Sequence, residues 1–257
     1  MSKNNYTQTE LMIVAASRLL EDGKTVFTGT GMPILAALLA KNTHAPRLAI
    51  IYEAGGMCPS TPPTIPLSVG DSMTTHKAIM AASMDYVMGF IQAGYGEYAF
   101  LGAAQIDIYG NINTTVIGPY DKPNVRLPGS GGGNDFGSLC WKTIILMKQD
   151  KQRFVKKLDF ITTPGYLTGK AAREKAGLPR DTGPWRVVTQ LGIYGFDDQD
   201  KKMTLLSVHP GVSIKDVQEN SGFPIKVSKK VDITPEPTNE ELKMLRSLDP
   251  YKVVLRK

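Results

Sequence analysis

The first fifth of the chain carries a strand–helix–strand pattern that limits the fold more than any other feature. Residues 24–28 (Lys-Thr-Val-Phe-Thr) are typical of a strand, and Gly29-Thr30-Gly31 follows as a tight turn. Pro33 suits the first turn of a helix over residues 33–41. Residues 48–52 (Leu-Ala-Ile-Ile-Tyr) form the apolar run expected of a strand buried on both faces of a parallel sheet. Two such strands joined by a helix make a right-handed βαβ unit, so we predict an α/β protein with an open, mostly parallel sheet and flanking helices.

Cap signals and turn residues predict the other elements. Three places have Ser or Thr followed three residues later by an acid, which is the spacing of a helix cap: Thr7 and Glu10, Ser213 and Asp216, Thr238 and Glu241. We expect a helix at each, the first ended by Gly23, and another helix over 76–92. Strands are predicted over 98–102 and 143–147, and a hairpin from 185–191 and 203–208 around Gly195 and Asp197-Asp198. Segments 59–75 and 163–184, rich in Pro with Ser/Thr or Gly, are predicted loops, the second of them an excursion or lid.

Length and composition exclude several classes of protein. A chain of 257 residues suits a single domain over 1–257, with a C-terminal extension from about residue 210 to 257. Cys58 and Cys140 have no CxxC spacing and the three histidines are scattered, so we expect neither a disulfide framework nor a metal site. The apolar runs are shorter than the roughly 20 residues of a membrane span, and residues 1–6 are polar. We therefore expect a cytoplasmic protein without a membrane partner.

The net charge of +6 is unevenly placed. Residues 135–257 carry 22 Lys/Arg against 15 Asp/Glu, whereas residues 1–134 carry 8 against 9. A basic half raises the possibility of nucleic acid, phosphate or an acidic protein as a partner. In the basic stretch 142–157, however, the apolar run 144–147 interrupts the charges and aromatic residues are few, so we interpret it as a solvated edge and expect no nucleic-acid partner.

Glu53 is the first candidate for chemistry. It follows the predicted buried strand directly and precedes Ala54-Gly55-Gly56. In open α/β sheets, ligands bind beyond the carboxyl ends of the strands, so a carboxylate at this place can stand in a ligand crevice. Position alone favours a structural role for Glu53, either paired with a lysine or capping a helix.

The second candidate is the glycine-rich stretch Gly129-Ser130-Gly131-Gly132-Gly133-Asn134. Glycines let several backbone N–H groups converge on one oxygen, which binds a phosphate or stabilises an oxyanion. The stretch is not a Walker A loop, because no Gly-Lys-Ser/Thr follows it. Gly29-Thr30-Gly31 does not match the dinucleotide fingerprint, because Ile34 stands where its third glycine is needed. A flexible surface loop remains the structural alternative for 129–134.

Taken together and in order, these stretches resemble the β subunits of family I CoA-transferases, and within the family the glutaconate CoA-transferase branch. The matching stretches are Gly29–Pro33, Ile51–Gly55, Ser68–Asp71, Gly102–Asp107 with Tyr109–Asn111, Gly129–Asn134 and Thr163–Gly165. The resemblance runs from about residue 6 to residue 250, which is nearly the whole chain. It implies the CoA-transferase (NagB/RpiA-like) fold. One departure is Gly133, where the family usually has a small residue such as Ala.

The resemblance also implies roles for individual residues. Glu53 matches the family's catalytic glutamate, and Gly131 and Gly132 match the region whose N–H groups serve as oxyanion donors. Gly29 and Ser68 stand in matching stretches and are expected to bind substrate. The family's enzymes need a homologous α subunit (heterodimer, α2β2 or larger), use coenzyme A as a substrate rather than a bound cofactor, and transfer it between carboxylic acids in a ping-pong reaction.

Two other enzyme classes on the same scaffold stay open. Relatives of these β subunits include acyl-CoA hydrolases, among them enzymes that cleave a carbon–carbon bond, and decarboxylases of CoA-bound diacids. Glu53 in an intact Glu-Ala-Gly-Gly context favours CoA transfer, whereas Cys58 leaves the decarboxylase alternative open. A CoA- or phosphate-binding module without catalysis is the remaining alternative, with Glu53 structural.

Overall fold

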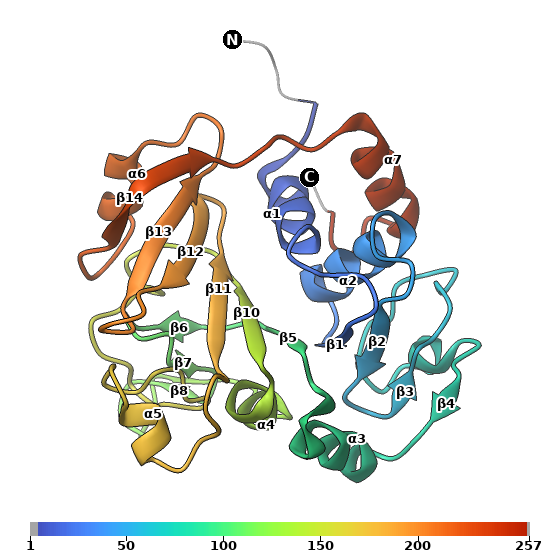
Figure 1. Cartoon of the computed structure of the whole chain (residues 1–257), viewed down its shortest axis with the longest axis horizontal. Helices are drawn as coiled ribbons and strands as arrows, with labels where there is room; N and C mark the ends of the chain where they lie inside the picture. The colour runs from blue at the N-terminus through green and yellow to red at the C-terminus, as the bar shows by residue number, and fades with distance from the viewer. Residues whose placement is uncertain (1–4, 256–257) are drawn as a thin grey trace. The chain divides into compact units, whose positions relative to one another are not determined.

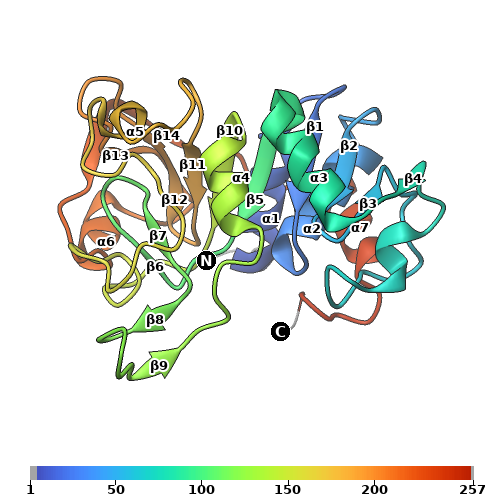
Figure 2. The ribbon, with the colours of Figure 1, turned by 90° about the horizontal axis from the view of Figure 1, so that it is seen from below.

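A computed structural model of the chain describes residues 5–255. These residues fall into two compact units. Unit 1 comprises Met1–Phe100 and Pro235–Lys257, and unit 2 comprises Leu101–Thr234. Figures 1 and 2 show the elements of both units in two views. The expectation of a single domain with a C-terminal extension stays a prediction, and each unit is described by itself.

Unit 1 is built on a sheet with strand order β5-β1-β2-β3-β4. The strands are β1 (Thr25–Thr28), β2 (Ala49–Tyr52), β3 (Gly56–Met57), β4 (Met80–Ala81) and β5 (Tyr98–Leu101). The helices are α1 (Gln8–Ser17), α2 (Met32–Asn42), the 3-10 turn η1 (Ser72–Thr75), α3 (Met84–Phe90), the π-type turn η2 (Ile91–Tyr95) and α7 (Asn239–Leu248).

The βαβ unit predicted from the sequence is confirmed. β1 and β2 pair in parallel from Thr25↔Ala49 to Thr28↔Tyr52, and β5 pairs in parallel with β1 on its other side. Residues 34–40 of α2 are buried, as are the middle residues of all three strands. The helix begins after Gly31, whose φ of +80° only glycine adopts readily, and Pro33 stands in its first turn. The apolar run 48–52 thus forms a central strand of the unit, as predicted.

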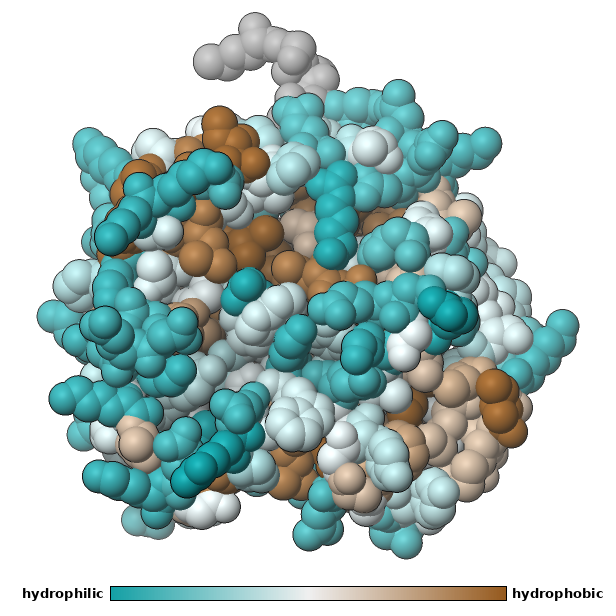
Figure 3. All heavy atoms as spheres, in the orientation of Figure 1, coloured by the Kyte–Doolittle hydropathy of each residue, from teal (hydrophilic) through white to brown (hydrophobic). Residues whose placement is uncertain are grey.

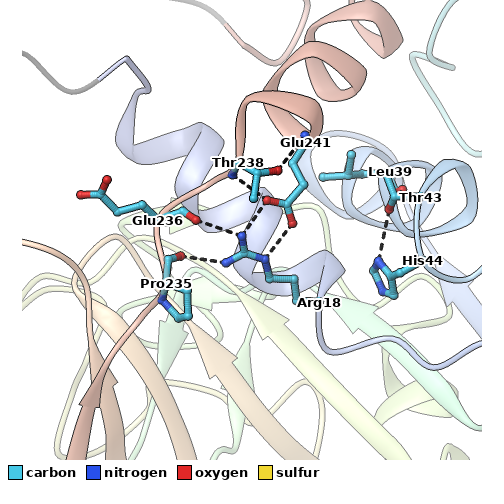
Figure 4. Close-up of polar contacts among 8 residues, drawn as sticks. All are labelled: Arg18, Leu39, Thr43, His44, Pro235, Glu236, Thr238 and Glu241. Atoms are coloured by element: carbon cyan, nitrogen blue, oxygen red, sulfur yellow. Dashed lines mark hydrogen bonds and ion pairs between the residues drawn. The ribbon is translucent and has the colours of Figure 1, made fainter.

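The end of the chain returns to unit 1 as α7, which packs on α1 and α2. Arg18, just after α1, forms an ion pair with Glu241 at 2.6 Å and donates to the carbonyls of Pro235 and Glu236 (Figure 4). On the other side, Arg246 of α7 pairs with buried Glu10 of α1 at 2.7 Å. Two arginine–glutamate pairs therefore tie the last helix to the first, and we call them the α1–α7 clasp.

Unit 2 contains the strand order β14-β13-β12-β11-β10. These strands are β10 (Lys142–Leu146), β11 (Pro184–Val188), β12 (Gly192–Phe196), β13 (Met203–Val208) and β14 (Lys226–Ile233). Two small hairpins precede them: β6 (Gln105–Ile106) with β7 (Ile112–Asn113), and β8 (Val116–Ile117) with β9 (Val125–Arg126). The helices are α4 (Gly133–Leu139), α5 (Ala172–Lys175) and α6 (Ile214–Glu219).

Among strands β1–β5 and β10–β14, more residues pair in parallel than antiparallel, which confirms the predicted fold class of an open, mostly parallel α/β sheet with flanking helices. The antiparallel pairs are β11–β12, β12–β13, β2–β3 and β3–β4. All three predicted capping boxes are present, at the N-termini of α1, α6 and α7. Within the described residues, no helix combines the length and apolar character that a membrane crossing requires.

Three predictions of secondary structure are wrong. The helix predicted over 76–92 exists only from Met84, because residues 80–81 pair with β3 as strand β4 instead. Segments 185–191 and 203–208 do not pair as a hairpin, since β12 lies between them and takes both partners. The first helix ends at Ser17, and Gly23 instead forms the turn before β1. In the first case the pairing with β3 overrides the local pattern, and in the second the residues between the two segments form a strand of their own.

Candidate active site

Glu53 stands at the carboxyl end of the buried strand β2, as predicted. The pair Thr28↔Tyr52 is the last of the β1–β2 ladder, so the next residues, Gly29 and Glu53, leave neighbouring strands at the same edge of the sheet. Neighbouring strands lie about 5 Å apart. Glu53 is partly exposed, and Gly29 has no atom within 4 Å of where a Cβ would stand. The structure therefore brings together Glu53 and Gly29, with open space beside the glycine.

The turn after Glu53 is tightly held by backbone. A Cβ on Gly55 would lie 1.8 Å from the carbonyl oxygen of Ala82, and one on Gly56 would lie 2.1 Å from that of Thr74. The amide of Ala82 donates to the carbonyl of Gly55 at 2.9 Å. Neither glycine can carry a side chain here, because the main chain of 74–82 occupies the space. The two glycines of the Glu-Ala-Gly-Gly stretch thus fix the turn that presents Glu53.

Cys58 follows in a left-handed conformation, with φ of 51°. It is half-buried, and burial raises the pKa of its thiol, with Lys41 acting in the opposite direction. A thiol must ionise to act as a nucleophile, so this environment is the wrong one for a reactive cysteine. The geometry thus favours the carboxylate of Glu53 over Cys58 as the reactive group of unit 1.

Ser68 lies in the exposed loop between β3 and η1. Its carbonyl accepts from the amide of Asp71, and the Asp71 carboxylate accepts from the amides of Leu67 and Met73. These backbone bonds hold the pKa of Asp71 below its usual range. The matching stretch Ser68–Asp71 therefore shapes its own loop, and the contact of Ser68 with a substrate stays a prediction.

The glycine-rich stretch of unit 2 is a turn that leads into α4. Gly131 is exposed with φ of +50°, and no donor or acceptor of Gly131 has a partner among the described residues. Gly132 caps α4, its carbonyl accepting from the amide of Phe136 at 2.9 Å. The side chain of Asn134 donates to the carbonyl of Thr162. This loop is anchored at both ends and leaves the Gly131 N–H available to a ligand.

The longest matching stretch, residues 103–111, proves to be scaffolding for the neighbouring loop. The side chain of Asn111, 1% exposed, donates to Asp107 and to the carbonyl of Leu167, and accepts from the amides of Gly165 and Leu167. Gly165 is required as well, because a Cβ there would lie 2.3 Å from the Gly110 carbonyl carbon. Asn111 thus holds the Thr163–Gly165 stretch in place. Two of the motifs that carry the resemblance therefore belong to one hydrogen-bond network.

The predicted site residues fall in both units. Glu53, Gly29 and Ser68 belong to unit 1, whereas Gly131 and Gly132 belong to unit 2. Sequence reasoning missed Arg173, a buried cation of unit 2 that bonds to the helix following the glycine loop. No motif marks it, because its partners are backbone carbonyls far along the chain. In the part of the chain that the structure describes, no group of three or more His, Cys, Asp or Glu side chains is placed to hold a metal ion.

Comparison with known proteins identifies the family of the chain. The model of the coenzyme A transferase family matches residues 9–220. The B subunit of glutaconate CoA-transferase from Acidaminococcus fermentans is 40% identical over 98% of this chain and 96% of its own length. The B subunit of 3-oxoadipate CoA-transferase from Pseudomonas knackmussii is 40% identical over 95% and 94%. The crystal structure of the A. fermentans glutaconate CoA-transferase matches with a TM-score of 0.93 and 38% identity, over 98% of both chains. The chain therefore belongs to the coenzyme A transferase family, as its motifs predicted.

The alternative classes are represented only among more distant relatives. A cholesterol ring-cleaving hydrolase subunit from Rhodococcus jostii is 29% identical over 88% of both chains. The decarboxylase AibA/AibB matches in structure with a TM-score of 0.82 and 25% identity, over 96% of both chains. The two nearer relatives reported above are both named as B subunits of CoA-transferases. The comparisons thus favour transfer over hydrolysis or decarboxylation.

Proposed function

We propose that this chain is the B subunit of an enzyme that transfers CoA between carboxylic acids, with Glu53 as the nucleophile. The observation that carries the proposal is the position of Glu53. The carboxylate stands at the carboxyl end of a buried parallel strand, in a turn fixed by two glycines that tolerate no side chain. Half-buried Cys58, whose pKa is raised, does not offer a competing nucleophile.

The chemistry needs a nucleophile that accepts an acyl group and then CoA. The Glu53 carboxylate attacks the thioester carbonyl, the C–S bond breaks, and CoA leaves as the thiolate, which produces a mixed anhydride. The thiolate then attacks the Glu53 carbonyl carbon and the first acid leaves as its carboxylate, so that Glu53 carries CoA as a thioester. A second carboxylate runs the same two steps in reverse. No net proton, oxidant or metal ion is consumed.

Each tetrahedral intermediate carries an oxyanion that needs hydrogen-bond donors. We assign this task to the backbone N–H groups of Gly131 and Gly132, and we assign substrate contacts to Gly29 and Ser68. The unpartnered Gly131 amide, judged among the described residues, and the open space beside Gly29 support the assignment. Loss of one donor from an oxyanion hole typically costs about 3–4 kcal/mol of barrier.

We further propose that the active enzyme contains a homologous A subunit. Both nearer relatives are named as subunits of CoA-transferases. Unit 1 exposes large apolar side chains at and beside β4 (Ile79, Met80 and Met84) and another, Leu67, in the loop before η1. Hydrophobic groups at the lower right of Figure 3 lie over this part of unit 1. Clusters of exposed apolar residues mark interaction sites, and we assign this one to the A subunit. CoA enters as a substrate, and the cytoplasm stays the predicted location.

The decisive experiment compares Glu53→Gln with Glu240→Gln in the complex with the A subunit. Glu240 is an exposed acid at the start of α7 and serves as the control. We expect Glu53→Gln to abolish CoA exchange between labelled acids and to remove the CoA thioester that hydroxylamine or borohydride traps on Glu53. Glu240→Gln should keep both. Exchange that survives in Glu53→Gln would refute the nucleophile, and release of free CoA or CO₂ without exchange would favour a hydrolase or a decarboxylase.

A further inference from the structure

Arg173 is a cation buried without a carboxylate partner among the described residues. It lies on the short helix α5, inside the Pro/Gly-rich excursion 163–184, and is only 3% exposed. Its guanidinium donates to neutral oxygens instead of an acid. Burial lowers its pKa to about 10, which still leaves it charged at neutral pH. A buried charge is costly unless every donor is satisfied, so this arrangement points to a specific task.

The oxygens that surround Arg173 come from three separate segments. Nη2 donates to the carbonyls of Gly137 and Ser138 at 2.9 and 2.8 Å, in the last turn of α4. Nη1 donates to the carbonyls of Pro164 and Gly165 at 3.2 and 2.9 Å. Nε and Nη2 also share the hydroxyl of Thr182, at 3.3 and 2.9 Å. One side chain therefore joins the end of α4, the 164–165 turn and the end of the excursion.

The carbonyls at the end of a helix have no intrahelical partner. In α4 the last carbonyls include those of Gly137 and Ser138, and the Arg173 guanidinium satisfies both while placing a positive charge at the negative end of the helix. The opposite end of the same helix is the Gly131-Gly132 turn. Since α4 spans only seven residues, a shift at its carboxyl end moves the glycine turn with it.

One side of α4 packs closely against the 162–165 segment. A Cβ on Gly137 would lie 2.1 Å from Cγ2 of Thr163, so α4 lies directly against that residue. Arg173 holds the two residues that follow Thr163 along the chain. The guanidinium thus fixes α4 against the 162–165 segment through hydrogen bonds to both. We infer that this contact sets the position of the glycine turn at the other end of α4.

We propose that Arg173 is a positioning residue for the Gly131-Gly132 turn, acting through α4 on the N–H groups that meet the oxyanion. This inference rests on the proposed function. Oxyanion donors must be held to within about 0.5 Å of their working geometry to be effective. Loss of Arg173 therefore slows the chemical steps while substrate binding changes little, since the guanidinium donors of Arg173 are occupied by oxygens of the protein itself.

The test compares Arg173→Met, Arg173→Lys and Arg186→Met in the complex with the A subunit. Arg186 is the matched control: it is a half-buried arginine of β11 in the same unit that stacks on Trp185 at 4.2 Å and forms no described hydrogen bond with α4. We expect Arg173→Met to lower kcat by about 10- to 100-fold with KM within threefold. Arg173→Lys, which keeps the charge and some of the donors, should recover part of the loss. Arg186→Met should stay within threefold of the parent enzyme.

A second readout does not depend on turnover. Hydrogen exchange of peptides covering 129–139 should become at least tenfold faster in Arg173→Met, while peptides of β1 and β2 keep their protection. Unchanged kcat and unchanged exchange in folded Arg173→Met would overturn the proposal, as would a KM effect without a kcat effect. If Arg173→Met does not fold, a folded Arg173→Lys with the parent kcat also overturns it. Failure of the proposed function is distinguishable, because Glu53→Gln would then retain exchange.

Discussion

Each unit is stabilised internally by a different kind of polar contact. In unit 1 the clasp fastens α7 to α1 through the ion pair Arg18–Glu241 (Figure 4) and the ion pair Arg246–Glu10. In unit 2 the corresponding work is done by amide and carbonyl groups, around Asn111 and Arg173. The glutamates of the clasp have lowered pKa values, and burial raises the pKa of Asp107 beside Asn111. Acid therefore acts in opposite senses on the clasp glutamates and on Asp107. Asp197 of unit 2, whose pKa is lowered to about 2 beside Lys226, follows the glutamates.

The largest effect on stability is expected at Asn111. Asn111→Ala leaves the amides of Gly165 and Leu167 and the carboxylate of Asp107 without their buried partner. The free energy of unfolding should fall by about 3–5 kcal/mol. Trp141 and Trp185, the two tryptophans of the sequence, both lie in unit 2, so tryptophan fluorescence in urea reports on this unit.

Asn239→Ala, at an exposed position at the start of α7, is the control and should change stability by less than about 0.5 kcal/mol. Equal midpoints for the two alanine variants would show that the Asn111 network contributes nothing.

A smaller loss is expected for Gly56→Ala in unit 1. The new methyl group would meet the carbonyl of Thr74, and overpacking of this kind costs about 1–3 kcal/mol. Gly29→Ala meets nothing within 4 Å and should cost less than about 1 kcal/mol. Thermal unfolding followed by circular dichroism measures both. A larger loss of thermal stability in Gly29→Ala than in Gly56→Ala would contradict the open space beside Gly29.

The two units are expected to weaken at different pH values. In unit 2, Asp197 has a pKa lowered to about 2 beside Lys226, so its contribution is lost only as the pH falls below 3.8. The folded pKa of Glu10 and Glu241 is lowered, so the stability from the clasp is present above their usual value of 4.5 and is lost as the pH falls. The folded pKa of Asp107 is raised, so its contribution is present below 3.8 and is lost as the pH rises. On acidification from pH 7, we expect helical circular dichroism to fall before tryptophan fluorescence changes.

The double variant Glu10→Gln/Glu241→Gln should lower the free energy of unfolding by about 1–2 kcal/mol at pH 7 and weaken the early acid transition. The expected loss is modest because Arg246 is partly exposed. A tryptophan transition that comes first would reverse the assignment of acid sensitivity to unit 1.

The smallest effect is expected at Tyr52, the residue before Glu53. Its hydroxyl is fully buried and has no hydrogen-bond partner among the described residues, and burial raises its pKa. Tyr52→Phe removes an unsatisfied polar group and should leave stability unchanged or raise it by up to about 1 kcal/mol. Urea unfolding measures the difference. A loss of more than about 1 kcal/mol would mean that the hydroxyl bonds to a water or a partner molecule.

Local signals predicted much of the fold and the placement of Glu53 after a buried strand. The capping boxes at Thr7, Ser213 and Thr238 join residues three positions apart, and the βαβ unit joins two strands that lie within one stretch of about 30 residues. For the same reason, the local pattern was enough to place Glu53 at a strand end. The roles of Gly55 and Gly56 were hidden, because the carbonyls they avoid belong to residues 74 and 82.

The sequence by itself determined the fold class, the family and the residue that carries the proposed chemistry. Only the tertiary structure decided which residues support it. The ribbon of Figure 1 shows α7, the last helix, beside α1, the first, and α7 is paired there with residues more than 200 positions away. Arg173 meets carbonyls 36 and 8 positions away, and β4 forms where a helix was expected. Such contacts depend on distant backbone groups, and a carbonyl carries no sequence signature of its own.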